Sequence, residues 1–132
     1  MDAGTRRLVR ERAGERCEYC QLHQRYSELL HHIEHIVSRQ HGGFDDPHNL
    51  ALACHRCNPH KGPNLTGIDF LTGEVAPLFH PRRDRWPDHF TFRGVHIGGL
   101  SASGRATIQV LAMNDARRLE LRLELLAIGP LA

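Results

Sequence analysis

The chain of 132 residues has the length of one domain, with 40% hydrophobic residues, 6% aromatic residues and a formal charge of +2. No apolar run approaches the roughly 18 residues that cross a bilayer. The charged N-terminus is also unlike a secretory signal. These features exclude a membrane-spanning protein and predict a cytoplasmic one with no membrane partner.

The first predicted element is a helix that Thr5 caps and that runs from Arg6 to about Gly14. A modest apolar stripe that includes Val9 lies along it, and arginines occupy its other sides. Those arginines either form a solvated face or contact DNA.

Strands and a short helix are predicted in the next part of the chain. The pattern predicts a strand over Leu29–Val37, a loop over Ser38–His48 and a second strand over Leu50–Ala53. A short helix over Cys54–Gly62 is expected to follow, because Gly62-Pro63 ends it.

Residues 63–132 carry weaker signals. We expect a loop over Pro63–Gly73 and then two strands, Phe90-Thr91-Phe92 and Val95-His96-Ile97. A helix over Arg105–Met113 with Ser103 as its cap is expected to follow. Asn114 is expected to cap a last helix, whose apolar face carries Leu119, Leu123 and Leu126. We interpret residues 1–132 as a single domain in which a mixed strand and helix extension, 63–132, packs on a core at 17–62.

All four cysteines lie in two CxxC pairs, Cys17 with Cys20 and Cys54 with Cys57. Two such pairs a few dozen residues apart are typical of a zinc ion held by four thiolates, which leave no open position for water. The site is therefore expected to be structural. Four free thiols, or one redox pair, are the alternatives. Because four thiolates and a zinc ion together carry about two negative charges, the net charge gives no argument for nucleic-acid binding.

Further polar and glycine motifs lie between and just after the cysteine pairs: Glu34-His35, Gly42-Gly43, Asn49-Leu50, and Asn58 to Lys61-Gly62. Their order, together with the cysteine pairs, resembles the HNH endonuclease family in its zinc-stapled, four-cysteine form. The resemblance implies an α+β fold class with a small ββα-metal core at 17–62, and a phosphodiester hydrolase that acts on DNA.

The family's roles carry over to four residues by resemblance. Glu34 would bind a hard cation, Mg²⁺ or Mn²⁺, and His35 would be the general base that deprotonates water. Asn49 would steady the loop that orients the base, and Asn58 would be the second cation ligand. These residue types suit the chemistry, because hard cations prefer oxygen ligands and histidine side chains transfer protons near neutral pH.

Strand geometry places a condition on this assignment. Consecutive strand residues point to opposite faces, so Glu34 and His35 can serve one phosphate only at a strand end or a sharp twist. His32 lies on the same face as Glu34, and is either a further cation ligand or a residue satisfied by the backbone.

Basic residues offer substrate contacts. Lys61 follows Asn58 by three residues and either meets the scissile phosphate or is simply solvated. Arg82 and Arg83 lie in the densest basic cluster, where they either contact DNA or are neutralised by neighbouring aspartates. The alternatives to an HNH endonuclease are a non-catalytic zinc-stapled module that binds nucleic acid and a structural zinc domain.

Overall fold

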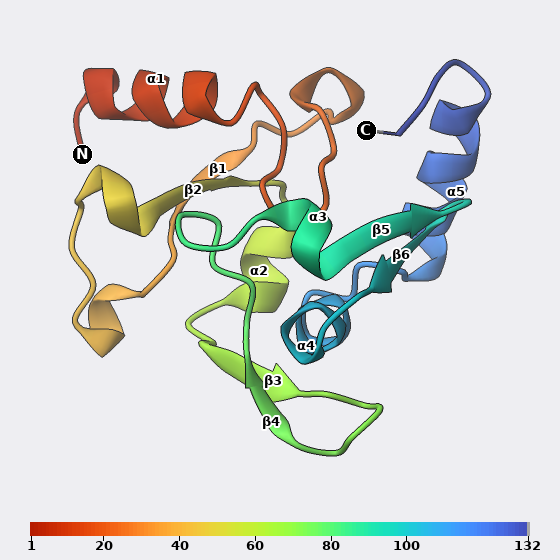
Figure 1. Ribbon diagram of the computed structural model, residues 1–132. Helices are drawn as coiled ribbons and strands as arrows, with labels where there is room; N and C mark the ends of the chain where they lie inside the picture. Colours follow the sequence, from red (N-terminus) through yellow and green to blue (C-terminus); the bar gives the residue numbers. More distant parts are fainter. Residues whose placement is uncertain (132) are drawn as a thin grey trace. The chain divides into compact units, whose positions relative to one another are not determined.

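The computed structural model describes residues 1–131 and divides into two compact units (Figure 1). The first unit comprises Met1–Pro63 and His80–Asp84, and the second comprises Asn64–Phe79 and the chain from Arg85 onward. The single domain over 1–132, with 63–132 packed on 17–62, stays a prediction. Within residues 1–131 no helix is both long enough and apolar enough to cross a membrane.

The first unit follows the predicted order of two strands and a helix. Strands β1 (His32–His35) and β2 (Leu50–Ala53) form an antiparallel hairpin that pairs Glu34 with Ala51 and His35 with Leu50. Helix α1 (Ala3–Arg12) precedes the hairpin and helix α2 (Cys57–Lys61) follows it. Three short 3-10 helices lie in the connections: Gln24–Tyr26, Arg39–His41 and Pro47–Asn49. The α+β class and the ββα core are confirmed.

The apolar core of the first unit lies between α1 and one face of the hairpin. Val9, Leu50 and Leu52 are fully buried there, and Ala13 and Ile33 pack against them. This core is small, and small cores often need a staple such as a bound metal ion.

Several element boundaries in the first unit differ from the predicted ones. The cap of α1 is Asp2, whose carboxylate accepts a hydrogen bond from the Thr5 backbone at 2.7 Å, and not Thr5. Strand β1 ends at His35, because the Val37 backbone N–H bonds to the side chain of Asn49. The helix α2 starts at Cys57, which places Pro59 in its first turn, where a missing donor costs little.

The second unit is built from two hairpins and three helices. Strands β3 (Thr66–Ile68) and β4 (Val75–Pro77) form one hairpin. Helix α3 (Trp86–His89) then leads into the other, β5 (Phe90–Arg93) with β6 (His96–Gly99). Helix α4 (Ala102–Val110) contacts β3, β4 and β6 and lies between the two hairpins (Figure 1). Helix α5 (Ala116–Leu126) ends the unit.

The sequence missed the β3–β4 hairpin, since its first strand lies where a loop is predicted over Pro63–Gly73. Helix α4 also begins earlier than predicted, and Ser101 caps it in place of Ser103. Asp115 caps α5 in place of Asn114.

The face of α5 that turns inward was also predicted wrongly. Arg118 and Arg122 are buried, whereas 66% of Leu123 is exposed. Arg118 donates to Leu111 O at 2.6 Å and Arg122 to Met113 O at 2.6 Å. These carbonyls follow the C-terminus of α4, where cationic donors are favourable, so hydrogen bonding decided the orientation.

Candidate functional site

The four cysteines converge in the first unit. Their Sγ atoms lie within 4.8 Å of one another and all four residues are buried. Cys20 Sγ and Cys54 Sγ are 3.7 Å apart, close to the roughly 3.8 Å that a tetrahedron with zinc–sulfur bonds of about 2.3 Å requires. The donor set and its geometry therefore fit a structural zinc ion.

The backbone supports the thiolate form of two of these sulfurs. The Cys20 N–H points at Cys17 Sγ (3.5 Å) and the Cys57 N–H points at Cys54 Sγ (3.4 Å). Hydrogen bonds from Cys17 lower the pKa of Cys54 and of Cys20, while burial raises the pKa of Cys17 and of Cys57. A cluster in which some thiols ionise at the expense of others favours binding of a cation, which removes the remaining protons.

The first cysteine pair is also tied to the hairpin through the two residues between its cysteines. Glu18 donates its backbone N–H to Leu52 O and accepts the Leu52 N–H on its carboxylate, both at 2.8 Å. Tyr19 is fully buried and its hydroxyl donates to Glu34 Oε1. The turn that carries Cys17 and Cys20 thus pairs with β2 and reaches across to β1.

Glu34 lies in a buried polar network. Only 6% of it is exposed, and Lys61 Nζ, in a residue 2% exposed, lies 3.6 Å from its second carboxylate oxygen. Lys61 also donates to Ile36 O at 2.8 Å. Burial raises the pKa of Glu34, and the charge of Lys61 and the Tyr19 hydroxyl oppose that rise. Each carboxylate oxygen therefore already has a partner.

The two expected cation ligands, Glu34 and Asn58, differ in how available they are in this arrangement. Oxygen ligands are the right chemistry for Mg²⁺ or Mn²⁺. However, the Glu34 carboxylate is enclosed by Tyr19 and Lys61, and the ammonium group supplies the positive charge beside it. The half-buried amide of Asn58 makes no hydrogen bond with any residue from 1 to 131. It is therefore the more available of the two side chains.

His35 lies on the other face of β1 and has a carboxylate partner. Its Nε2 is 2.7 Å from Asp45 Oδ1, and Arg39 Nη2 contacts both oxygens of Asp45 at 2.9 and 3.0 Å. Hydrogen bonds from His35 and Arg39 lower the pKa of Asp45, which is therefore ionised at neutral pH. In the tautomer that donates Nε2–H to Asp45, Nδ1 of His35 is left as an acceptor.

Asn49 braces the loop that carries Asp45. Its Oδ1 accepts the Val37 N–H at 2.9 Å, and its Nδ2 donates to Val37 O and to Phe44 O, each at 2.9 Å. Gly43 is required for this close packing, because a Cβ there would lie 1.8 Å from Val37 O. The Asn49 amide therefore closes the loop from Ser38 to His48 at its base.

This geometry accompanies a family match over the same part of the chain. The family model described as HNH endonuclease matches residues 17–64, just over a third of the chain. No curated protein and no solved structure is similar enough to be matched. The family resemblance of the motifs is thereby confirmed for residues 17–64, which are called the HNH domain below. The matched segment contains both cysteine pairs, the hairpin and α2.

The HNH domain brings some predicted site residues together and separates others. Glu34 and Lys61 meet in the buried network, whereas His35 lies with Asp45 on the other face of β1. His32 is exposed at the start of β1. Arg82 is paired with Glu18, while Arg83 is exposed.

The aromatic residue near that basic cluster has packed partners. Trp86 lies 5.1 Å from Phe90 and 5.3 Å from Phe92, measured between ring centroids. These tilted ring pairs give Trp86 a packing role in the second unit.

Sequence reasoning missed two residues of the HNH domain. Asp45 follows the hairpin's first strand by ten residues and lies in the segment Ser38–His48, which the sequence predicts only as a loop. Asp46 forms a turn in that loop by accepting the His48 N–H at 2.8 Å, whereas Asp45 is directed to His35. Tyr19 carried no signal except its position between two cysteines.

The cysteine cluster predicts that Cys57→Ala removes zinc and unfolds the first unit. A structural zinc ion stabilises the folded state directly, because the unfolded chain has no formed site. Elemental analysis and circular dichroism should show zinc loss together with loss of structure. His55→Ala, two residues away, is the matched control and should keep its zinc. A folded wild-type protein without bound zinc, and with four titratable thiols, would contradict the assignment.

The buried ion pair predicts that Lys61→Met costs about 3–5 kcal/mol of unfolding free energy, because it leaves the Glu34 carboxylate buried without its counter-charge. Urea denaturation measures this loss. The double variant Lys61→Met with Glu34→Gln should recover most of it, since no buried charge then remains. A cost for Lys61→Met below about 1 kcal/mol, the range of exposed pairs, would show that the pair is solvated.

Proposed function

We propose that this protein is an endonuclease that hydrolyses phosphodiester bonds of DNA, with His35 as the general base. The observation that carries the proposal is the hydrogen bond from His35 Nε2 to Asp45 within an HNH endonuclease domain. That bond fixes the tautomer and the orientation of the ring, which a general base requires.

The proton transfer follows from this arrangement. Nδ1 of His35 accepts a proton from a water molecule as the water oxygen forms a bond to phosphorus and the bond to the leaving oxygen breaks. The ionised Asp45 stabilises the imidazolium that results, and Arg39 holds Asp45 in place through two contacts. Asn49 fixes the loop on which both residues depend.

The three basic candidates for DNA contact, Lys61, Arg82 and Arg83, differ in exposure, and we assign them different roles. Arg83 is exposed, and we assign it to phosphate contact. Lys61 and Arg82 are engaged with Glu34 and Glu18, so their charges stabilise the domain in this arrangement.

The family resemblance also implies a catalytic cation. A bound Mg²⁺ or Mn²⁺ ion would neutralise charge that develops on the phosphate. For Glu34 and Asn58 to hold it, Tyr19 and Lys61 must first release the carboxylate. The proton transfer to His35 described above involves neither of these two ligands.

One observation favours the second candidate, a zinc-stapled module that binds nucleic acid without cutting it. Glu34 is enclosed in the network with Tyr19 and Lys61, and a purely structural Glu34 would leave the domain without its cation. Binding alone, however, has no need of a carboxylate that orients His35, so the nuclease is the better supported function.

Incubation of plasmid DNA with the protein tests the function, and His35→Ala tests the base. Proton abstraction by a placed side chain contributes about 10² to 10⁴-fold, and the variant should lose about that much of the cleavage rate. Its affinity for DNA should stay unchanged in a gel-shift assay, because phosphate contacts come from arginines. Equal loss of cutting and binding would mean that His35 is structural, and undiminished cutting would place the base elsewhere.

Asp45→Asn is the companion variant in that assay. The amide keeps a hydrogen-bond partner at Nε2 but removes the charge that stabilises the imidazolium. It should lower the maximal cleavage rate and leave the affinity for DNA as it is. An unchanged rate would remove Asp45 from the proposal without touching His35.

Asn58→Ala should raise the Mg²⁺ or Mn²⁺ concentration that gives half-maximal cutting, because it removes a proposed oxygen ligand. Glu34→Gln should do the same while keeping an acceptor for Tyr19. Zinc content, measured in the same preparations, should remain at that of the wild type. Cleavage by the wild type that persists in EDTA with zinc retained would show that no hard cation takes part.

A further inference from the structure

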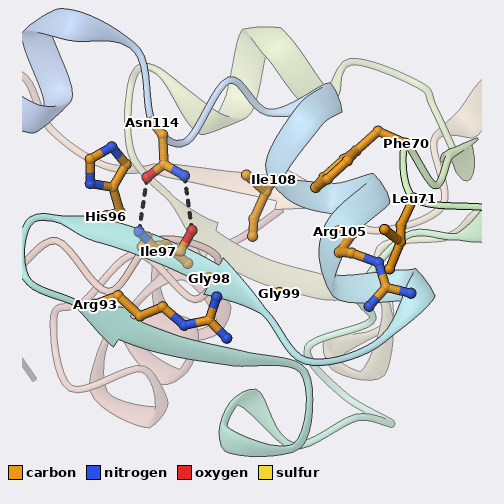
Figure 2. A pocket seen from close by; sticks show the side chains of 10 residues that line it. All are labelled: Phe70, Leu71, Arg93, His96, Ile97, Gly98, Gly99, Arg105, Ile108 and Asn114. Carbon is orange, nitrogen blue, oxygen red and sulfur yellow. Dashed lines mark hydrogen bonds between the residues drawn. The ribbon is translucent and has the colours of Figure 1, made fainter.

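The second unit contains a half-open groove of about 540 Å³, a size within the usual range for small-ligand sites. It is bounded by β6, by α4 and by the turn that follows β3 (Figure 2). None of the site residues discussed above lines it.

The backbone of β6 forms one side of the groove and is held in place by its neighbours. Asn114 Oδ1 accepts the Ile97 N–H at 2.9 Å, and its Nδ2 donates to Ile97 O at 2.8 Å, as the dashed lines in Figure 2 show. Gly99 allows α4 to approach β6, since a Cβ there would lie 2.8 Å from the Arg105 backbone nitrogen. The strand beside the groove is therefore fixed from both sides.

A buried aspartate fixes the opposite side. Asp69 is fully buried and accepts hydrogen bonds from Leu71 N (3.1 Å), from Thr72 Oγ1 (3.0 Å), and from Arg105 Nε and Nη2 (2.8 and 3.0 Å). The turn that these bonds order presents Phe70 and Leu71 to solvent, 63% and 69% exposed. Two large apolar side chains are thus held outward on a rigid turn.

The groove also holds an arginine without a counter-charge. The side chain of Arg93 makes no hydrogen bond or ion pair with any residue between Met1 and Leu131. Its guanidinium lies against Gly98, where a Cβ would come within 2.9 Å of Cζ, so the glycine gives it room (Figure 2). Asp69 already balances Arg105, so Arg93 leaves the groove with a positive charge. His96, its partner across the strand pair, is exposed beside it.

We propose that this groove binds an unpaired nucleotide of a nucleic-acid strand, with its phosphate at Arg93 and its base against Phe70 and Leu71. Guanidinium groups bind phosphate oxygens in pairs, and aromatic side chains stack on any base. The groove combines both features. None of the described residues that line it is acidic, and the charge of Arg105, which does line it, is balanced by the buried Asp69. The inference deepens the proposed action on DNA by adding a single-strand contact outside the HNH domain.

Fluorescence anisotropy of a labelled single-stranded oligothymidylate tests the proposal with the full chain. Phe70→Ala and Arg93→Gln should each weaken binding about 10-fold. Arg93→Gln should in addition lower the salt dependence of binding by about one phosphate contact. Leu123→Ala and Arg117→Gln are the matched controls, since both residues are exposed on α5 and neither lines the groove. Circular dichroism should show every variant folded.

Two competitors identify which part of the nucleotide is bound. Deoxyadenosine monophosphate should displace the labelled strand more effectively than inorganic phosphate, because only the nucleotide offers a base to Phe70. Equal competition by phosphate would reduce the groove to an anion site and overturn the proposal. So would wild-type affinity in both groove variants, or no binding of the single strand by the wild type.

This test is independent of cleavage. A protein that binds the single strand through Arg93 and Phe70 but leaves plasmid intact supports the groove and rejects the nuclease. A protein that cuts plasmid with unchanged efficiency in both groove variants, and shows no binding of the single strand, supports the nuclease and rejects the groove.

Discussion

The convergence of four buried thiols is the constraint on which the first unit depends. Cys17 and Cys20 precede the hairpin, and Cys54 and Cys57 follow it, so one ion bound by all four closes the chain around β1 and β2. The apolar core beside the hairpin has few buried side chains, with Val9 among them. A small core leaves a large share of the folding free energy to the metal.

The cysteine cluster also positions other residues of the HNH domain. Helix α2 begins at Cys57, so the cysteine that would bind zinc also places Asn58 directly after it and Lys61 about one turn further on. Tyr19, between the first two cysteines, delivers its hydroxyl to Glu34. The buried network of Tyr19, Glu34 and Lys61 therefore adjoins the cysteine cluster, and it joins the cysteine turn, β1 and α2.

The alternation of β1 separates two kinds of chemistry. The Glu34 side chain points into the buried network, where Lys61 compensates its charge. The His35 side chain points to the loop Ser38–His48, where it contacts Asp45, which Arg39 also contacts. One strand thus contributes structural support on one face and a positioned imidazole on the other. In the second unit polar side chains have a comparable structural part: Asp69 and Asn114 fix turns and strands, and Arg118 bonds to carbonyls at the end of α4.

The features that rest on local spacing follow from the sequence alone. The CxxC pairs predict the zinc ligands, because two residues between cysteines form one tight turn, and alternation predicts that Glu34 and His35 diverge. The motif order predicts the HNH domain and its ββα core.

Contacts between distant segments, in contrast, depend on the tertiary structure. Only folding brings Asp45 to His35 and encloses Glu34 between Tyr19 and Lys61. The orientation of α5 is a further example. Its leucines predict an apolar inner face, but Arg118 and Arg122 are the buried residues, because they donate hydrogen bonds to the carbonyls of Leu111 and Met113. Side-chain periodicity records which residues share a face, but the direction of that face depends on which donors and acceptors the rest of the chain leaves to be satisfied.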